Sequence, residues 1–342
     1  MSNSFKHTLS DQEEKDVFHF LSNLSYCSVL QNPHWNRAIN KKKNVCYYIE
    51  KNEDKIVCFS LIVENFWSAK IMFGPCSEDS NILADAILKI HEYYKRKGFA
   101  ALEIQQGMPL SQKTEETDYF VRKRVNFSQA ISEENWTTIL ISLKDETDNI
   151  FESFSKNHKR SITKARNNGL KPVALTEMAD IEKFSWLFDK MYDRRKLLKP
   201  FENSPLVFRE IFELFQNEMK GFFIGVFTPD NELVGGACFT ICNDTIMYQY
   251  GCTDARSNLP ILHLAFFEAI SMAKTMNVKQ FDLCGINLMV KESDQVFKIN
   301  RFKSGFNGVV VYYPRKMTFN LNAFKVFLLK GAKCAYNFFR RV

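Results

Sequence analysis

The stretch that decides the fold is residues 221–252, GFFIGVFTPDNELVGGACFTICNDTIMYQYGC. It holds three apolar runs, at 221–227, 233–242 and 245–252, separated by the short sequences Thr228–Asn231 and Asn243–Asp244. Pro, Asp and Asn favour turns, and apolar runs that such turns join pair as neighbours. We therefore predict three antiparallel strands that lie side by side.

A helix and a fourth strand are predicted after this meander. Apolar residues at 3.6-residue spacing predict a helix from about residue 260 to 276; they are Leu262, Phe266, Ile270 and Ala273. Residues 280–283 predict a short strand, and we expect a loop to close the stretch at residues 302–306. Ligand sites commonly lie in the loops beyond strand ends, so Lys303 is a candidate site residue.

The first half of the chain repeats this order of elements. Three strands, the third ending at Phe73, precede a helix that Asp79 or Ser80 caps and Gly98 ends. A short strand then brings residues 99–104 opposite residues 278–283, at an offset of about 179 residues, far longer than a solenoid period. The two halves share little identity, so a chance similarity is the alternative. We interpret the chain as two copies of one domain.

Charge and cysteine content narrow the class of protein. The chain has 342 residues, enough for two domains, and a formal net charge of +7, which favours anionic partners without requiring nucleic acid. Its nine cysteines form no Cys-x-x-Cys pair, and residues 1–10 carry no secretory signal. No apolar run reaches the ~20 residues of a membrane-spanning helix. We therefore expect a cytoplasmic protein with reduced thiols.

Several common catalytic motifs are absent from the sequence. There is no Gly-rich phosphate loop and no His-Glu-x-x-His, and the six histidines are dispersed without an evident Ser or Cys partner. We expect neither a metal site nor a covalent hydrolase. The chemistry that remains is group transfer by positioning and electrostatics, which needs cations and backbone donors.

A basic segment lies between the two copies. Residues 146–168 are predicted to form one or two helices that Gly169 ends, and Lys156, Arg160 and Lys164 fall four residues apart on one face. Such a cationic face suits phosphate. A solvated surface helix without a ligand is an equal alternative.

The C-terminal segment, residues 319–342, is also basic. We predict an amphipathic helix with Phe324, Phe327 and Leu328 on its apolar side and lysines and arginines on the rest. Such a helix can lie on an anionic membrane surface, so a peripheral contact with the inner membrane is one expectation. We favour the alternative, that its apolar side packs on its own domain.

Six short motifs occur along the chain in an order typical of one family. They are Gln31-x-Pro33-x-Trp35, Gly74-Pro75, SKNHKRSITKARNNG at 155–169, Gly235-Gly236 with Tyr248-x-Tyr250-Gly251, Phe281-Asp282-Leu283-Cys284-Gly285, and Phe302-Lys303-x-x-Phe306. Together they resemble the FemABX family, peptidoglycan-bridge aminoacyltransferases built from two GNAT-like domains. The resemblance spans nearly the whole chain.

The resemblance implies an α/β fold with mixed sheets, in which two GNAT-like acyltransferase domains follow one another without the helical arm of some relatives. We place the first domain at residues 1–145 and the second, with the donor site, at residues 146–318. The basic amphipathic helix occupies residues 319–342. The duplication derived above is what this family implies.

Catalytic roles are implied for two residues. Lys303 matches the lysine of the family's Phe-Lys-x-x-Phe motif and is expected at the reaction centre, where its ammonium favours the tetrahedral transition state. Phe302 is expected beside it.

Substrate-binding roles are implied for five more. Arg37 matches a cation that holds the diphosphate of a UDP-linked muropeptide, and Lys199 falls near a second phosphate-binding position. Trp35, Tyr248 and Tyr250 complete the set, and Trp35 is also expected to pack in the core of the first domain.

The implied co-substrates are a charged tRNA as donor and a UDP-linked or lipid-linked muropeptide as acceptor, with no cofactor. A polyanionic tRNA suits the basic segment, with Lys156, Lys159, Arg160 and Lys164 as phosphate-binding residues. Residues 254–260 lack the glycines with which acyl-CoA enzymes of this fold bind pyrophosphate, so an acyl-CoA donor is disfavoured.

Two alternatives stay open. Relatives in surface-polysaccharide or lipid-modification pathways use acyl-CoA, so one is an acyl-CoA-dependent N-acyltransferase acting on a surface-glycan or lipid precursor. The other is a non-catalytic tandem domain that binds RNA or a phosphorylated glycan. The tyrosine and aspartate that contact the acceptor in the family have no clear match, because residues 101–106 occupy that region, so the acceptor stays open.

Two residue types in the second half are expected to be structural. Gly235-Gly236 predicts a β-bulge, which bends its strand. Asp282 could be a catalytic carboxylate, but we favour a buried side chain that bonds to nearby backbone or to Asn287.

Overall fold

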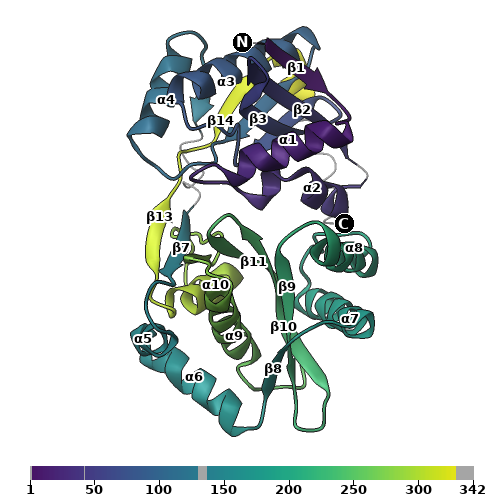
Figure 1. The fold of residues 1–342 in the computed structure, drawn as a ribbon, viewed down its shortest axis with the longest axis vertical. Helices are drawn as coiled ribbons and strands as arrows, with labels where there is room; N and C mark the ends of the chain where they lie inside the picture. The colour runs from purple at the N-terminus through teal and green to yellow at the C-terminus, as the bar shows by residue number, and fades with distance from the viewer. Residues whose placement is uncertain (1, 42, 130–136, 329–342) are drawn as a thin grey trace. The chain divides into compact units, whose positions relative to one another are not determined.

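The computed structural model describes residues 2–41, 43–129 and 137–328 (Figure 1). The chain divides into two compact units. The first takes in residues 1–33, 40–136 and 312–342, and the second residues 34–39 and 137–311. Among the described residues, no helix combines the length and the apolar character needed to cross a bilayer.

Within the described residues, a mixed seven-stranded sheet forms the first unit, in the order β1-β2-β3-β4-β5-β14-β6. Its strands are β1 (Ser2–Lys6), β2 (Asn44–Asn52), β3 (Lys55–Asn65), β4 (Ser68–Met72), β5 (Ala101–Gln105), β6 (Ser128–Gln129) and β14 (Met317–Asn320). The meander β2-β3-β4 is antiparallel, and β5 is parallel to β4. Its helices are α1 (Asp11–Ser22), α3 (Ser80–Arg96) and α4 (Gln112–Arg122), with a 3₁₀ turn at Val29–Gln31.

The second unit has a sheet of the same size within the described residues, in the order β13-β7-β12-β11-β10-β9-β8. Its strands are β7 (Thr137–Ser142), β8 (Lys171–Ala174), β9 (Gly221–Phe227), β10 (Leu233–Cys242), β11 (Thr245–Thr253), β12 (Gln280–Asp282) and β13 (Val309–Tyr312). Its helices are α2 (Pro33–Ile39), α5 (Thr147–Ser153), α6 (Lys156–Asn167), α7 (Met178–Arg195), α8 (Ser204–Asn217), α9 (Ile261–Thr275) and α10 (Gln295–Ser304).

The two units share one order of elements, which confirms the predicted duplication and fold class. In the first unit β2-β3-β4 is followed by α3 and by β5, which returns parallel to β4. In the second, β9-β10-β11 is followed by α9 and by β12, which returns parallel to β11. The protein is therefore a tandem of two α/β units with mixed sheets. No long helical arm interrupts the second unit within the residues described.

Side-chain caps begin two helices of the first unit, and for the second of them the predicted cap at Asp79 or Ser80 is confirmed at Asp79. Ser10 caps α1 by accepting a hydrogen bond from the Glu13 backbone N–H, and the Glu13 carboxylate accepts from the Ser10 N–H at 3.1 Å. Asp79 caps α3 by accepting from the N–H groups of Asn81 and Ile82. Each cap satisfies backbone donors that a helix start otherwise leaves unpaired.

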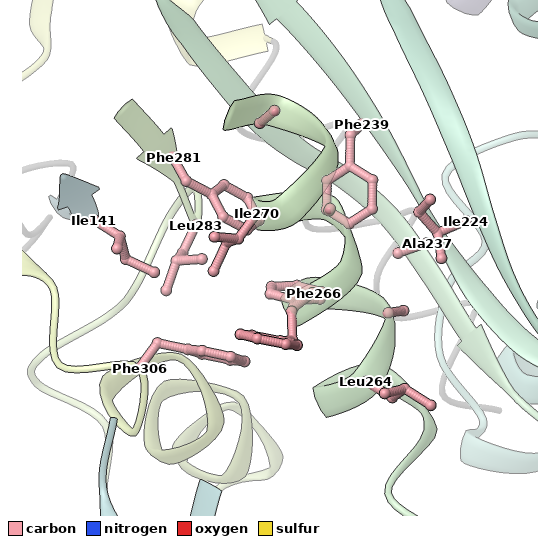
Figure 2. Close-up of a cluster of buried hydrophobic side chains, with 14 of the residues drawn as sticks. Ile141, Ile224, Ala237, Phe239, Leu264, Phe266, Ile270, Phe281, Leu283 and Phe306 are labelled. Carbon is pink, nitrogen blue, oxygen red and sulfur yellow. The ribbon is translucent and has the colours of Figure 1, made fainter. Parts of the chain in front are cut away.

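The core of the second unit is built around α9 (Figure 2). Phe266 of α9 lies between Phe239 of β10, Phe281 of β12 and Phe306 after α10, with ring centroids 5.6, 5.6 and 5.4 Å away. All four rings are fully buried. Because Phe306 follows α10 directly, this packing fixes the end of α10 and with it Lys303.

One helix, α10, replaces a predicted loop. Phe302 and Lys303 lie on α10, where the sequence predicts a loop. The outward residues Val296 and Ile299 of α10 are exposed, so the segment lacks the one-sided apolar pattern that predicts a helix. Helix α2 begins at Pro33, because proline is favoured at a first helical position.

Helix α7 is absent from the sequence-based prediction although its signal is present. Ile181, Phe184, Phe188 and Met191 recur at three- and four-residue spacing, and all four are buried. This spacing is the pattern of one helix face.

The two units differ from the division drawn from the sequence at residues 145 and 318. Strand β7 precedes residue 146 but pairs with β12 of the second sheet, and β14 pairs with β5 of the first. Pairing between strands far apart in the sequence leaves no local signal. Residues 323–328 are helical, and the rest of the predicted C-terminal helix, residues 329–342, lies outside the described residues.

Candidate functional site

The site lies where two parallel strands of the second unit separate. Strands β11 and β12 pair over three residues, from Thr245 opposite Gln280 to Met247 opposite Asp282. Strand β11 then continues to Thr253, whereas β12 ends at Asp282. Beyond Met247 the two chains diverge and leave a fork, as expected where a strand loses its neighbour.

Lys303 of α10 fills this fork. Its Nζ donates to the carbonyl oxygens of Cys284 and Gly285, at 3.1 and 2.8 Å, just past the end of β12. The same Nζ lies 5.7 Å from the ring centroid of Tyr248, the first β11 residue beyond the paired segment. Lys303 is 5% exposed, so its ammonium is held by protein groups on nearly every side.

Asp282 sets the shape of the backbone that receives Lys303. Its Oδ1 accepts a hydrogen bond from the Cys284 N–H at 2.7 Å and another from the Thr138 hydroxyl. Cys284 has a φ of 58°, in the left-handed region that residues with a Cβ rarely adopt. The bond from Asp282 stabilises this turn and directs the Cys284 carbonyl toward Lys303. The predicted burial and backbone bonding of Asp282 are confirmed, whereas Asn287 instead bonds to Asn300 and Met289.

Burial opposes the charges of both Lys303 and Asp282. It lowers the pKa of Lys303, and the neighbouring Cys284 and Asp282 offset part of this effect. It raises the pKa of the Asp282 carboxyl, against the hydrogen bonds from Thr138 and Cys284 and the charge of Lys303. Each group therefore shifts the pKa of the other toward the charged form, against the effect of burial.

Two histidines hold α10 in place behind Lys303. His158 Nε2 donates to the Phe302 carbonyl oxygen at 2.7 Å, and its Nδ1 lies 3.1 Å from the Ser155 hydroxyl. The His158 and His263 rings are 4.5 Å apart. Burial lowers the pKa of His158, and burial with His158 nearby lowers that of His263 to about 4. Both are neutral at pH 7, so Nε2 carries the His158 proton.

These histidines are functional candidates that the sequence analysis missed. The only local signal for His158 is its place in the motif at residues 155–169, and its bond to Phe302 spans 144 residues of sequence. Phe302 itself turns its ring into the α9 core, 5.1 Å from Phe266 and 4.9 Å from His263. It supports Lys303 from behind and does not face the fork.

The two tyrosines predicted to bind substrate lie on opposite faces of the sheet. A bulge at Gln249 shifts the register, because Tyr250 pairs with Cys238 and Tyr248 with the next residue, Phe239. The extra residue breaks the two-residue alternation of a strand. Tyr248 therefore faces α9 and Lys303, whereas Tyr250 packs against Phe201 and helices α7 and α8. Strand β10 also shifts against β9 between Leu233 and Gly235, so the bulge predicted at Gly235-Gly236 lies one residue earlier, at Val234.

Trp35 belongs to the core of the second unit, which corrects its expected place in the first. It is fully buried, with its ring stacked at 6.4 Å from Phe215 and 6.3 Å from Tyr250. It therefore anchors α2 and offers no surface to a substrate in this structure. Arg37, two residues further along α2, is exposed.

Lys199 lies in the segment after α7 and is bound to carboxylates. Its Nζ is 3.0 Å from Asp193 and 3.7 Å from Asp189. Both acids lie on α7, so Lys199 closes the C-terminal end of that helix. A phosphate would compete with these two acids for the same ammonium.

The predicted basic face of α6 lines a shallow groove of about 630 Å³. Its lining includes Lys156, Lys159, Arg160 and Lys164, with Thr163, Asn167 and the ring of Phe151 between them. Lys159 pairs with Glu152 at 2.7 Å, and within the described residues Lys156, Arg160 and Lys164 have no ion pair. The groove therefore keeps three cations for an anionic ligand.

A second hollow, of about 310 Å³, lies beside the loop between β11 and α9. Arg256 is one of the residues that line it, and its guanidinium donates hydrogen bonds to Asp254 and Glu232. The Asp254 carboxylate also accepts from the Arg256 backbone N–H at 2.8 Å. Lys303 lines neither hollow.

One group of potential metal ligands occurs among the described residues, in the first unit. Ligand atoms of His7, Cys46 and Glu64 lie within 4.8 Å of one another. The Lys97 ammonium is 3.6 Å from Glu64 and 3.5 Å from His7. A cation already occupies this cluster, so it does not fit a metal ion.

No family model and no curated protein matches the sequence. The structure is similar to that of FemX, with a TM-score of 0.78 and 12% identity over 96% of this chain and 99% of that one. It is also similar to the C-terminal domain of a putative lysylphosphatidylglycerol synthetase from Agrobacterium fabrum (TM-score 0.60, 11% identity, 95% and 97% covered). A third similar structure is a tandem GNAT protein from the clavulanic acid biosynthesis pathway (TM-score 0.54, 8% identity, 94% and 99% covered).

These likenesses define the class of fold as tandem GNAT-like. Within that class, the chain follows the fold of FemX from end to end, as the FemABX-like motifs imply. At identities this low, the similarity shows the fold alone. The substrates are inferred from the site.

Proposed function

We propose that this protein is an aminoacyltransferase that moves an aminoacyl group from a charged tRNA to an amine of a peptidoglycan precursor, a UDP-linked or lipid-linked muropeptide. The observation that carries the proposal is the buried ammonium of Lys303 at the fork between β11 and β12. An ammonium in a site that excludes water stabilises an oxyanion by roughly 3–4 kcal/mol. The acceptor class rests on the FemABX resemblance.

In the proposed reaction the acceptor amine attacks the carbonyl carbon of the aminoacyl ester. A C–N bond forms, and the carbonyl oxygen becomes an oxyanion to which Lys303 Nζ donates in place of a backbone carbonyl. The C–O bond to the tRNA ribose then breaks, and the proton lost by the amine ends on the ribose oxygen. The ammonium favours this transition state over the bound ester because the negative charge exists only there.

The groove on α6 supports a polyanionic donor. Lys156, Arg160 and Lys164 share one face of the helix without internal ion pairs, as a phosphate backbone requires. Replacing Arg160 and Lys164 with Glu should weaken tRNA binding at least about tenfold and reduce the slope of log affinity against log salt by about two. Lys183→Glu, on α7 and paired with Asp180, is the matched control and should change neither. An unchanged affinity in the double variant would remove the groove from the tRNA site.

The loop between β11 and α9 argues against the alternative acyl-CoA donor. In acyl-CoA enzymes of this fold a glycine-rich loop offers backbone N–H groups to the pyrophosphate. Here the Asp254 carboxylate takes the Arg256 N–H, and a negative side chain at that position repels phosphate.

A single assay separates the three functions. The protein is incubated with UDP-linked muropeptide and either charged tRNA or acetyl-CoA, and the mass of the muropeptide is followed. A mass increase with tRNA alone supports the proposal, and an increase with acetyl-CoA alone replaces it with the acyl-CoA alternative. Absence of product with both donors, together with tight binding of RNA, would favour the non-catalytic binding domain.

A further inference from the structure

The start of the C-terminal helix is fastened to the β3–β4 turn of the first unit. Ala100 joins the two segments, because its N–H donates to the Trp67 carbonyl at 2.7 Å and its own carbonyl accepts from the Leu321 N–H at 2.8 Å. Lys325 adds a second link, with Nζ 2.6 Å from the Gly98 carbonyl and 5.0 Å from the centroid of the Trp67 ring. The turn and residues 321–325 are therefore joined by direct contacts and by the backbone of Ala100.

These contacts leave the apolar face of the amphipathic helix exposed to solvent. Lys325 and Val326 are half-buried against the first unit, whereas Phe324 and Phe327 are 70% and 72% exposed and Leu328 is exposed beside them. Phe324, Phe327 and Leu328 are spaced three and four residues apart, so they share one helix face. The expectation that this apolar side packs on its own domain is therefore wrong for the residues described.

Phe66 in the β3–β4 turn presents a further exposed ring. Asn65 pairs with Ser68, so Phe66 and Trp67 form a two-residue turn, and Phe66 is 80% exposed with a φ of 43°. That backbone conformation favours Gly or Asn and costs a residue with a large side chain. The positive φ of Phe66 therefore lowers stability, although its ring is exposed to water. The ring packs against that of Trp67, with centroids 4.5 Å apart.

Charge identifies the kind of partner. Residues 321–342 contain five Lys or Arg residues and no Asp or Glu. Cations next to outward-facing aromatic and leucine side chains are typical of segments that insert their apolar groups at the boundary of an anionic bilayer. Stacking on RNA bases would not use Leu328, which has no ring.

We propose that Phe66, Trp67, Phe324, Phe327 and Leu328, here called the aromatic face, dock this protein on an anionic membrane surface. The exposed rings enter the headgroup region, and the basic residues that follow Leu328 in the sequence pair with lipid phosphates. The proposal concerns membrane binding alone, and it is tested independently of the transfer reaction.

Flotation with lipid vesicles tests it on the full chain, with no tRNA or muropeptide present. The unmodified protein should float with phosphatidylcholine vesicles that contain phosphatidylglycerol, less with phosphatidylcholine alone, and less at high salt. Combined Phe66→Ser, Phe324→Ser and Phe327→Ser should reduce vesicle affinity by about tenfold for each ring. Tyr119→Ser is the matched control and should float like the unmodified protein, because Tyr119 is equally an exposed ring of the first unit, 56% exposed on α4.

Phe66→Asn separates docking from folding. Asn suits a positive φ, so this variant should melt at a higher temperature than the unmodified protein and yet bind vesicles more weakly. Equal flotation of the triple variant, or no flotation of the unmodified protein, overturns the proposal. So would binding of single-stranded RNA, or a dimer in solution, that is lost with the same three substitutions, since the aromatic face would then serve RNA or a second copy.

Discussion

Among the differences between the two copies of the repeat, one concerns the point where the fourth strand meets the third. In the first unit β5 pairs with β4 along the full length of both, and the Gly74 N–H extends the pairing to the Gln105 carbonyl at 3.0 Å. In the second unit pairing stops at Met247 and Asp282, and Lys303 occupies the opening. We call the first unit the closed copy, because β4 and β5 pair along their full length, and the second the open copy, because β11 and β12 do not. The buried ammonium of Lys303 lies in the open copy.

Backbone packing keeps the first copy closed. A Cβ on Gly107, just past β5, would lie 2.3 Å from the Phe73 carbonyl oxygen, so only glycine allows the two chains to come this close. In the second copy the corresponding chains are held apart by the Lys303 side chain and the Cys284 turn. The two units therefore share one arrangement of strands. The candidate reaction centre lies in the unit where the pairing of the fourth strand with the third stops early.

The sharpest test of this comparison exchanges a side chain in each copy. Lys303→Met keeps the length of the side chain and removes its charge, so kcat for aminoacyl transfer should fall by roughly 10²–10³-fold with tRNA binding kept. Gln105→Met alters the closed copy, where Gln105 donates to the Pro314 carbonyl, and should leave kcat unchanged in the folded protein. Both are measured by single-turnover transfer. An equal loss in both variants would mean that the copies do not divide their roles.

Acid should weaken the open copy through His263. Its pKa in the folded state is about 4, below the ordinary 6.5 of an unfolded chain, so the unfolded state binds a proton that the folded state refuses. Stability is then unaffected above pH 6.5 and falls as the pH drops from 6.5 toward 4. We expect the free energy of unfolding to fall by roughly 2 kcal/mol more between pH 7 and pH 5 in the unmodified protein than in His263→Gln.

Urea unfolding at the two pH values measures this difference. His19→Gln, an exposed position on α1, is the control and should behave like the unmodified protein. A pH dependence that persists in His263→Gln would assign the acid sensitivity to another group.

Forcing the closed copy apart should cost stability and no activity. Gly107→Ala places a methyl group against the Phe73 carbonyl and should lower the free energy of unfolding by about 1–3 kcal/mol. Urea unfolding and the rate of transfer are measured on the same sample. A change in rate larger than the loss of folded protein would show that the closed copy takes part in the reaction.

The smallest expected effect concerns Asp282, whose charge raises the pKa of Lys303. Removing the charge of Asp282 in Asp282→Asn takes away a group that raises the pKa of Lys303, so that pKa falls further. The alkaline limb of the kcat/KM profile should then move to lower pH, by up to about one unit. Asp244→Asn, exposed and paired with Lys279, is the control. A shift toward higher pH would contradict the proposed role of the ammonium.

The sequence predicted the parts of the fold that local patterns determine. The turns Thr228–Asn231 and Asn243–Asp244 and the spacing of Leu262, Phe266 and Ile270 locate the meander and α9 within a few residues. Lys303 was reached through a short motif; it lies on α10 and its Nζ reaches the backbone just past β12, and its catalytic role stays a prediction.

What the sequence could not predict depends on contacts between distant residues. The bulge at Gln249 separates Tyr248 from Tyr250 because of the way β11 meets β10, although strand alternation places them on one face. Trp35 packs on Phe215 and Tyr250, about 180 and 215 residues away in sequence, so its place in the second unit has no local signal. The same holds for the bond between His158 and Phe302.

Strand β14 has a consequence for how the protein is made. It pairs with both β5 and β6, yet its residues follow the whole of the second unit in the chain. During synthesis the ribosome therefore releases every strand of the second sheet before the first sheet can close, and the nascent first sheet waits with two open edges. Such edges invite pairing with other chains, so chaperone demand should be concentrated in the N-terminal part of the nascent protein.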